Sequence, residues 1–194
     1  GYKTSANELL RDHTTLKKPG MLQTKISLAL ANGGAFVFID AIDPVGTLNP
    51  KVYETLGGIF ERTAELESCL GGELLEDVAV YLSTESKVDF ADNGKFVMDT
   101  AERNPHGDAV RRSAEALMRA HIPFGVVTRK SIGELRRYKV VIVPNLLMML
   151  PEEERAFREY VRGGGKLYAS KWTSLVTADG VRKDDFLLSD VFGV

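Results

Sequence analysis

Cysteine is almost absent from this sequence, since Cys69 is the only one in 194 residues. A single thiol cannot form an internal disulfide or build a zinc site from several thiolates. We therefore expect a reducing compartment, a cytoplasmic location and no metal site. Cys69 lies beside Leu66 and Leu70 near the end of an expected helix, which indicates an inert, partly buried thiol.

The chain also lacks an excess of charge of one sign and a long hydrophobic run. Its 25 Lys and Arg residues against 27 Asp and Glu residues give a formal net charge of -2. No strong field is available to hold a polyanion, so neither nucleic acid nor an anionic membrane is an expected partner. The apolar stretches, such as residues 35–42, are shorter than the roughly 20 residues that span a bilayer. No signal peptide is visible in the first residues.

Apolar runs do alternate with segments of helical spacing along most of the chain. Two helical pieces are expected between residues 5 and 30, on either side of Pro19-Gly20. The other expected strands are 35–39, 77–82, 124–127, 140–143 and 166–170, and the other expected helices are 52–66, 109–120, 132–138 and 151–161. Such alternation predicts an α/β fold, with a doubly wound parallel sheet that is covered on both faces.

Gly71-Gly72 is the expected domain boundary, which gives domains of residues 1–72 and 73–194. Before it, strand 35–39 has no polar face, so we expect it to be buried on both sides. A loop and helix 52–66 follow that strand and complete one β/α unit. After the boundary, the polar segment 83–103 is unusually long for a loop, which is typical of either a functional or a disordered segment.

The first seventy residues resemble the last β/α unit of a retaining glycosidase barrel of the α-L-fucosidase or β-galactosidase kind. The resemblance implies a TIM-type barrel remnant in a parent glycoside hydrolase whose substrate is a carbohydrate and whose catalytic carboxylates lie on strands outside this chain. The matching segments are Gly1-Tyr2-Lys3-Thr4, Leu9-Leu10, the run from Asn32 to Asp40, the run from Asp43 to Leu48, and the helix from Tyr53 to Phe60.

Residues 77–194 resemble the trimerisation domain that is attached to certain β-galactosidases and fucosidases. The resemblance implies a flavodoxin-like sheet of the class I glutamine-amidotransferase fold, incomplete at its C-terminal end. It also implies a non-catalytic structural or oligomerisation domain without a cofactor, whose partners are its own barrel and the other subunits of a homo-oligomer. The matching segments are Val78 to Leu82, His121-Ile122-Pro123-Phe124, Tyr138 to Asn145, and Tyr160 to Gly165.

The turn after strand 166–170 decides whether this sheet could catalyse a reaction. Amidotransferases of this fold carry a cysteine nucleophile on a strained turn at that place. Here the turn reads Ser170-Lys171-Trp172, and Ser170 lacks the glycines of a Gly-x-Ser-x-Gly elbow. We therefore expect no catalytic residue, and no activity for this chain alone.

Six residues remain as candidates for contact with a ligand. Asp40 and Asp43 follow strand 35–39 and could bind sugar hydroxyls, although a turn and a local cap explain them more simply. Ser83, Thr84 and Asn145 follow strands of the second domain, at the sheet edge where open α/β folds bind ligands. These strand ends and segment 83–103 support an alternative function, a stand-alone flavodoxin-like protein that binds a sugar or a nucleotide.

His106, the sixth candidate, lies just before helix 109–120. With Asp108 it could bind a metal or a sugar, or face a neighbouring subunit, but Asp108 more simply serves as the N-cap of the helix. Gly163-Gly164-Gly165 follows a helix and precedes a strand, whereas phosphate-binding glycines follow a strand. It is therefore interpreted as a helix C-cap and not as a nucleotide loop.

Overall fold

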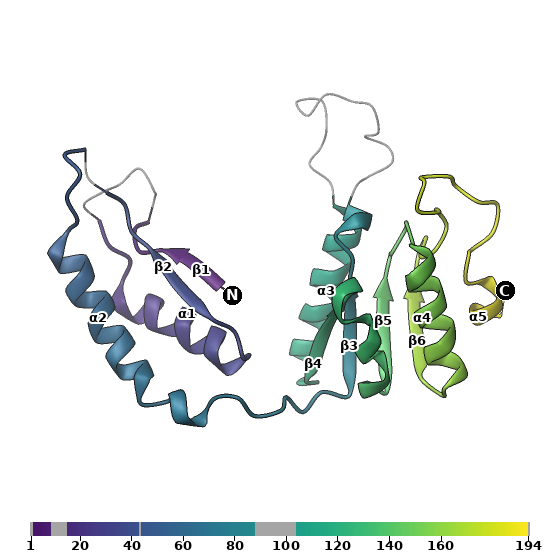
Figure 1. Cartoon of the computed structure of the whole chain (residues 1–194), viewed down its shortest axis with the longest axis horizontal. Helices are drawn as coiled ribbons and strands as arrows, with labels where there is room; N and C mark the ends of the chain where they lie inside the picture. Colours follow the sequence, from purple (N-terminus) through teal and green to yellow (C-terminus); the bar gives the residue numbers. More distant parts are fainter. Residues whose placement is uncertain (1, 9–14, 43, 88–103, 194) are drawn as a thin grey trace. The chain divides into compact units, whose positions relative to one another are not determined.

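A computed structural model describes residues 2–8, 15–42, 44–87 and 104–193 of the chain (Figure 1). It contains two compact units, Gly1–Leu74 and Leu75–Val194. Both units are of the α/β class and contain parallel strands, as the alternating pattern predicts. Among the helices of the described residues, none combines the length and the apolar character needed to cross a bilayer.

The first unit is a pair of parallel strands with two helices. Strand β1 (Tyr2–Ser5) pairs in parallel with β2 (Phe36–Ile39), so that Tyr2 lies opposite Phe36. Helix α1 spans Pro19–Ala31 and α2 spans Pro50–Ala64, and both begin with the proline that suits a first helical turn. The expected helix from residue 5 was wrong at its start, because Ser5 ends a strand, and its continuation at 9–14 lies outside the described residues. The buried core consists of Ala6, Leu22, Ile26, Val52, Leu56 and Ile59.

Strand β2 is buried on one face only. Phe36 and Phe38 point toward the helices, and the ring of Phe38 packs edge-on against Phe60 of α2 with 5.4 Å between ring centroids. Val37 and Ile39 alternate with them and are 56% and 37% exposed. The expectation of burial on both faces was therefore wrong for this unit, because its two helices cover one face of the strand.

A short 3₁₀ helix, η1 (Glu67–Cys69), follows α2. The thiol of Cys69 is exposed, so the expected partial burial was wrong. Gly71 comes two residues later with φ of 94°, a backbone conformation that favours glycine.

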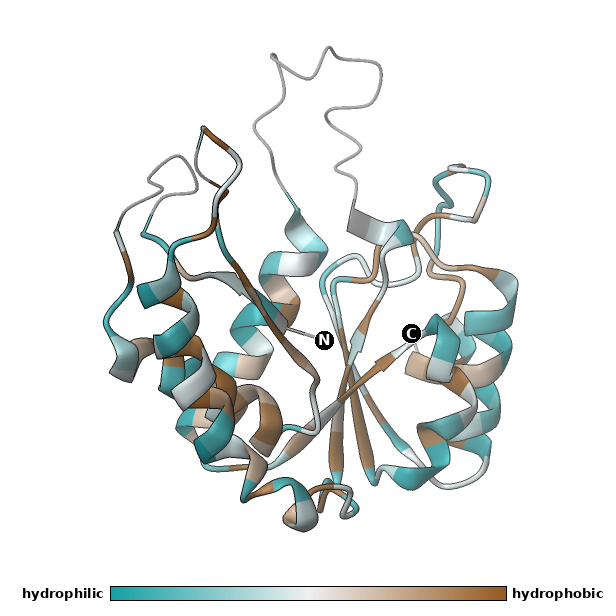
Figure 2. Cartoon of the chain, turned by 60° about the vertical axis from the view of Figure 1, so that its left-hand side comes forward, coloured by the Kyte–Doolittle hydropathy of each residue, from teal (hydrophilic) through white to brown (hydrophobic). Residues whose placement is uncertain are grey.

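The second unit is built on a four-stranded parallel sheet (Figures 1 and 2). Its strand order is β4-β3-β5-β6, and every adjacent pair runs in parallel. Its elements are β3 (Val78–Leu82), η2 (Glu85–Lys87), α3 (Pro105–Arg119), β4 (Phe124–Thr128), the 3₁₀ helix η5 (Arg129–Arg137), β5 (Val140–Pro144), α4 (Pro151–Arg162), β6 (Lys166–Ser170) and α5 (Ser189–Phe192). Figure 2 shows hydrophobic residues concentrated along the strands, as a sheet covered by helices requires.

The two faces of this sheet are covered to different extents. Ala79 and Tyr81 of β3 belong to a core that η5 and α4 cover, and among its described members none comes from α3. Helix α3 contacts β3 and β5, so it lies on the opposite face. There the register aligns Val80, Val126, Ile142 and Tyr168 in one row across the four strands. Val80 is fully buried in the middle of this row, whereas Val126 and Tyr168 on the outer strands are 51% and 60% exposed.

Three glycines end α4 as the sequence predicts. The backbone N–H of Gly164 donates to the carbonyl of Val161 at 2.9 Å, and that of Gly165 donates to the carbonyl of Tyr160 at 3.0 Å. Gly163 is the C-cap residue, and Gly164 after it has φ of 91°, the left-handed conformation that favours glycine at this position. The interpretation as a helix C-cap is confirmed.

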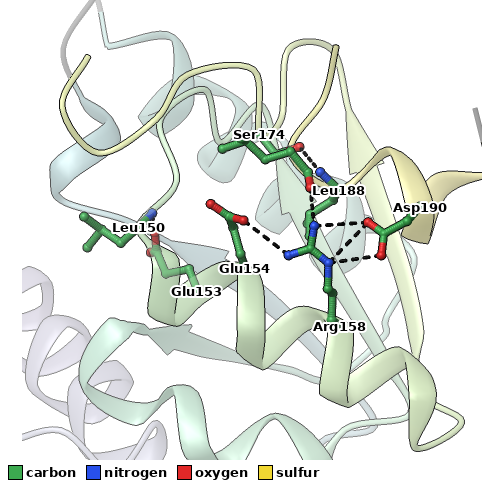
Figure 3. A network of polar contacts seen from close by, with 8 residues as sticks. Leu150, Glu153, Glu154, Arg158, Ser174, Leu188 and Asp190 are labelled. Atoms are coloured by element: carbon green, nitrogen blue, oxygen red, sulfur yellow. Dashed lines mark hydrogen bonds and ion pairs between the residues drawn. The ribbon is translucent and has the colours of Figure 1, made fainter. Parts of the chain in front are cut away.

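The C-terminal segment is held to α4 by Arg158 (Figure 3). The Arg158 guanidinium donates to both carboxylate oxygens of Asp190, with Nε 3.0 Å from Oδ2, and also contacts Glu154 at 3.2 Å. It donates as well to the carbonyl of Leu187. The next residue, Leu188, donates its N–H to the Ser174 hydroxyl at 3.2 Å and buries its side chain in the core. One cation therefore fixes α5 against α4.

Candidate ligand site at the carboxyl ends of the strands

The carboxyl ends of β5 and β6 are joined by side-chain hydrogen bonds. The backbone N–H of Asn145, just after β5, donates to the Ser170 hydroxyl at 3.2 Å. In return the Asn145 Oδ1 atom accepts from the backbone N–H of Trp172 at 3.4 Å. Asn145 is only 6% exposed, and its φ of 49° is in the left-handed region that asparagine tolerates. The two strand ends thus form one fixed edge.

Helix α3 brings His106 to the same edge. The helix begins at Pro105, and its N-cap is Asn104, whose side chain accepts from the Gly107 N–H at 2.9 Å. The expectation that Asp108 is the N-cap was therefore wrong, because the helix starts earlier and Asp108 lies in its first turn. The earlier start places His106 in the helix, where it is fully buried.

The His106 imidazole connects the ends of β3 and β5. Its Nε2 atom accepts from the backbone N–H of Ser83 at 2.9 Å, while its Nδ1–H donates to the carbonyl of Pro144 at 2.8 Å. These two bonds fit one tautomer of the neutral ring. Burial lowers the pKa of His106 below its ordinary value of 6.5, although the Pro144 carbonyl opposes the shift. His106 therefore acts here as a neutral tie between strands, with no ring nitrogen left for a ligand.

A cavity of about 230 Å³ opens beside this tie. Four of the seven residues around it are polar or charged and two of those, His106 and Asn145, are candidates from the sequence. The cavity is lined by Ser86, Pro105, His106, Asn145, Leu147, Lys171 and Trp172. Ser83 and Thr84 do not line this cavity. Their hydroxyls donate instead to the carboxylate of Glu85, at 3.3 Å and 3.0 Å. The structure therefore brings two of the predicted residues into one cavity and directs two others to Glu85.

Lys171 and Trp172 are two of the lining residues that the sequence did not indicate as ligand contacts. They lie in the turn after β6, whose sequence was considered above only as the place of a nucleophile. Lys171 has φ of 52°, in the left-handed region that residues other than glycine adopt only rarely. The turn contains the amine of Lys171 and the indole of Trp172, and it has no thiol. The guanidinium of Arg182 lies 5.9 Å from the centre of the Trp172 ring.

The first unit places polar groups at the carboxyl ends of its own strands. Both carboxylate oxygens of Asp40, directly after β2, are buried and have no hydrogen-bond partner among the described residues. The same holds for Oδ1 of Asn7, two residues after β1. Parallel strands end at the same edge of a sheet, so both groups belong to that edge. Asp43, the other candidate in this loop, lies outside the described residues.

A buried acid that the sequence did not single out for a site lies at the start of α4. The carboxylate of Glu153 accepts from the Tyr81 hydroxyl through Oε1 and from the Leu150 N–H at 2.8 Å through Oε2. Burial raises the pKa of Glu153 and, together with this hydrogen bond, that of Tyr81. The described residues contain no cluster of three or more His, Cys, Asp or Glu side chains suited to a metal ion.

Residues 76–192 match the family described as the β-galactosidase trimerisation domain. The chain belongs to this family. The match covers the entire four-stranded sheet and the helices that cover it, and it confirms the resemblance that the sequence of this part carries.

Two curated relatives are β-galactosidases. β-Galactosidase BglY of Alicyclobacillus acidocaldarius is 26% identical over 140 residues, which is 70% of this chain and 19% of that protein. β-Galactosidase Pbg of Clostridium perfringens is 24% identical over 136 residues, with the same coverage of 70% and 19%. The chain thus spans about a fifth of the length of each of these relatives.

Solved structures of glycosidases share the fold. Gan42B, a GH42 β-galactosidase of G. stearothermophilus, superposes with a TM-score of 0.70 at 17% identity, over 94% of this chain and 28% of that one. The α-L-fucosidase isoenzyme 2 of Paenibacillus thiaminolyticus gives a TM-score of 0.68 at 21% identity, over 89% of this chain and 25% of that one. At these identities the likeness is one of fold.

Proposed function

We propose that residues 73–194 are a non-catalytic assembly domain of a larger glycoside hydrolase, a β-galactosidase or an α-L-fucosidase, and that residues 1–72 are the last β/α unit of its barrel. The observation that carries this function is the family match over residues 76–192, on a sheet whose turn after β6 holds Ser170, Lys171 and Trp172 in place of a nucleophile. The partners are the barrel domain and further copies of the same subunit.

The strand order supports a flavodoxin-like sheet for the second domain. In that fold the first strand lies between the second and the third, and the fourth follows the third. The order β4-β3-β5-β6 has the same arrangement, with β3 as the first strand. The switch point therefore falls between β3 and β5, where the His106 imidazole already joins the two strand ends.

The first unit has features of one segment of a barrel. Its two strands are parallel, and its helices cover one face of β2. In a TIM-type barrel the other face of each strand points into the barrel, where branched apolar side chains fill the interior. The exposed Val37 and Ile39 are suited to that position. The buried oxygens of Asp40 would then lie at the carboxyl end of a barrel strand, where sugar hydroxyls could donate to them.

No turnover is expected from this chain by itself. Retaining glycosidases need two carboxylates about 5 Å apart, from the ends of different barrel strands. Nitrophenyl galactosides and fucosides should therefore remain intact when incubated with the 194-residue chain. Clear turnover would contradict a non-catalytic role, because it would show a complete active site within the chain.

Assembly is tested by the mass of the chain in solution. Analytical ultracentrifugation over a hundredfold range of concentration should show a discrete species at three times the monomer mass. A monomer throughout that range would count against an assembly role for this domain.

The alternative, a stand-alone binding protein, has less support, because both curated relatives extend far beyond the matched segment. The single cysteine supports the cytoplasm as the compartment of the parent enzyme.

A further inference from the structure

We propose that the cavity beside Asn145, Lys171 and Trp172 is a binding site for a small organic anion, a carboxylate or a phosphate ester carried on a sugar-sized ring. This site belongs to the second unit alone and does not depend on the assembly role proposed above. Its volume of about 230 Å³ is below that of pockets for drug-sized molecules, which suits a ligand of one ring.

The buried side chain of Asn145 provides the first argument. Its Oδ1 atom accepts from the Trp172 N–H, so the amide orientation is fixed and Nδ2 carries the remaining donors. Asn145 as a residue is only 6% exposed, and Nδ2 donates to no other described residue. Because Asn145 lines the cavity, this donor is available to an acceptor there. Asn145 therefore favours a ligand that presents an acceptor oxygen.

The charge around the cavity provides the second argument. Lys171 lines it, Arg182 lies over the ring of Trp172, and neither has an ion-pair partner among the described residues. Of the seven lining residues none is acidic. Glu85, which is adjacent to Ser86 in the chain, does not line the cavity, and its carboxylate is paired with Arg129 at 3.1 Å. The surroundings thus favour an anion.

The position in the fold provides the third argument. Pro105 and His106 line the cavity and form the first turn of α3, a helix of 15 residues. The N-terminus of a helix carries a partial positive charge, and in α/β folds it faces ligands at the carboxyl ends of the strands. The neutral ring of His106 adds no charge of its own. The N-terminus of α3, the Asn145 amide and the Lys171 amine therefore all favour the binding of an anion.

Trp172 indicates that the cavity favours an anionic group attached to a ring. Its indole is exposed at the rim of the cavity, and Arg182 lies over the ring. Aromatic faces bind flat or CH-rich surfaces, and a sugar ring offers such a surface. A bare inorganic anion could use the donors but not the indole. We therefore expect the complete ligand to bind more tightly than its anionic group alone.

Trp172 also makes the test direct, because it is the only tryptophan of the chain. Its fluorescence would be titrated with galacturonate, galactose 6-phosphate, inorganic phosphate and neutral galactose. A saturable change with one of the two sugar anions is expected, at a dissociation constant at least about tenfold lower than with galactose. A stronger response to galacturonate would identify a carboxylate ligand, and a stronger response to galactose 6-phosphate a phosphate ester.

Three variants separate the contributions. Asn145→Asp keeps the acceptor for the Trp172 N–H and tolerates the left-handed backbone, but it replaces the Nδ2 donor by a negative charge. It should weaken binding of the sugar anion by tenfold or more. Lys171→Met should weaken it by about tenfold. Lys166→Met removes an exposed lysine at the other end of β6 and should leave binding unchanged.

Equal responses to galactose and to the sugar anions would overturn the proposal, as would a flat titration with all four probes. Unchanged affinity in Lys171→Met would also overturn it, and that variant alters an exposed side chain, so the sheet should fold as before. Far-UV circular dichroism of each variant would verify the fold. The oligomer mass is measured separately, so failure here leaves the assembly role standing.

Discussion

The hydroxyl of Tyr81 in β3 donates a hydrogen bond to the carboxylate of Glu153 in the first turn of α4. Both side chains are fully buried. The other oxygen of Glu153 accepts from the backbone N–H of Leu150, the residue at the N-cap. A single carboxylate therefore caps α4 and ties it to the central strand.

Replacing Glu153 separates these roles from its charge. Glu153→Ala should destabilise the second unit by about 2 to 4 kcal/mol, because the Tyr81 hydroxyl and the Leu150 N–H lose their partner inside the protein. Glu153→Gln should cost less than Glu153→Ala, since the amide oxygen can accept from the Leu150 N–H while its NH₂ group donates to the Tyr81 oxygen. Urea unfolding monitored by circular dichroism would measure both. Equal losses of stability for the two variants would contradict this assignment.

The raised pKa of Glu153 predicts a pH dependence of known sign. Between the ordinary value of 4.5 and the higher native value, the folded state holds a proton that the unfolded state has released. The contribution of Glu153 to the free energy of unfolding is therefore fully present below pH 4.5, and it is lost as pH rises through the native pKa. The difference in unfolding free energy between wild type and Glu153→Gln should shrink or reverse along that rise. A difference that stays constant with pH would show that the native pKa is not raised.

His106→Ala should destabilise the second unit by about 2 to 4 kcal/mol, because a buried ring and two hydrogen bonds to backbone groups disappear. The lowered pKa of His106 gives the opposite pH dependence to that of Glu153. As pH falls below 6.5 the unfolded state takes up a proton that the folded state resists, so wild-type stability decreases until the native pKa is passed. Unfolding curves from pH 8 downward should lose this decrease in His106→Ala. If the variant keeps it, another group is responsible.

Arg158→Met should loosen the C-terminal segment without unfolding α4. The methionine keeps an apolar stem but loses the bonds to Asp190, Glu154 and the Leu187 carbonyl. Amide hydrogen exchange should become faster between residues 172 and 192, with little change in the strands. Arg155→Met is the matched control, since this exposed arginine of the same helix has no ion-pair partner among the described residues. Equal exchange in the two variants would contradict the anchoring role.

The carboxyl of Asp190 offers a second check on that anchor. Its hydrogen bonds with Arg158 hold its pKa below the ordinary 3.8. The contribution of this pair is present above 3.8 and is lost as pH falls through the lower native value. The excess exchange of Arg158→Met over wild type should therefore vanish in strongly acidic solution.

Gly165→Ala should destabilise the second unit by about 1 to 3 kcal/mol. A Cβ atom at this position would lie 2.3 Å from the ring of Tyr160, whose hydroxyl donates to the Tyr138 carbonyl at 3.1 Å. The ring would have to move and strain that bond. Gly133→Ala, in η5, meets no atom within 4 Å and should leave the melting temperature unchanged or slightly raised. Equal melting temperatures for the two variants would contradict a packing requirement at Gly165.

Patterns within short segments predicted most elements of the second unit. Buried runs such as Val140–Pro144 have no polar face, and helix α4 begins with a proline followed by three acids. Strand β1 was missed because Tyr2–Ser5 is short and contains Lys3 and Thr4, so only its pairing with a strand more than thirty residues later defines it. Pairing at such a distance leaves no local pattern.

The candidate site was predicted in part for the same reason. Asn145 was predicted because it follows a buried strand, and ligands bind at the carboxyl ends of the strands in open α/β sheets. The sequence also identified the turn that contains Lys171, but not the cavity that joins it to Asn145. The role of His106 depends on Ser83 and Pro144, which are 23 and 38 residues away. Glu153 was not predicted as a buried partner, since nothing local indicates its bond to Tyr81.

The unequal covering of the sheet offers a practical route to the geometry of an oligomer. Val126 and Tyr168 are solvent-accessible positions on the two outer strands, while the adjacent Val127 belongs to the core. Cysteines introduced at 126 or 168 could carry spin labels without disturbing that core, once the exposed Cys69 is replaced by serine. Pulsed electron resonance with one labelled position at a time would then measure separations between subunits from opposite edges of the same sheet.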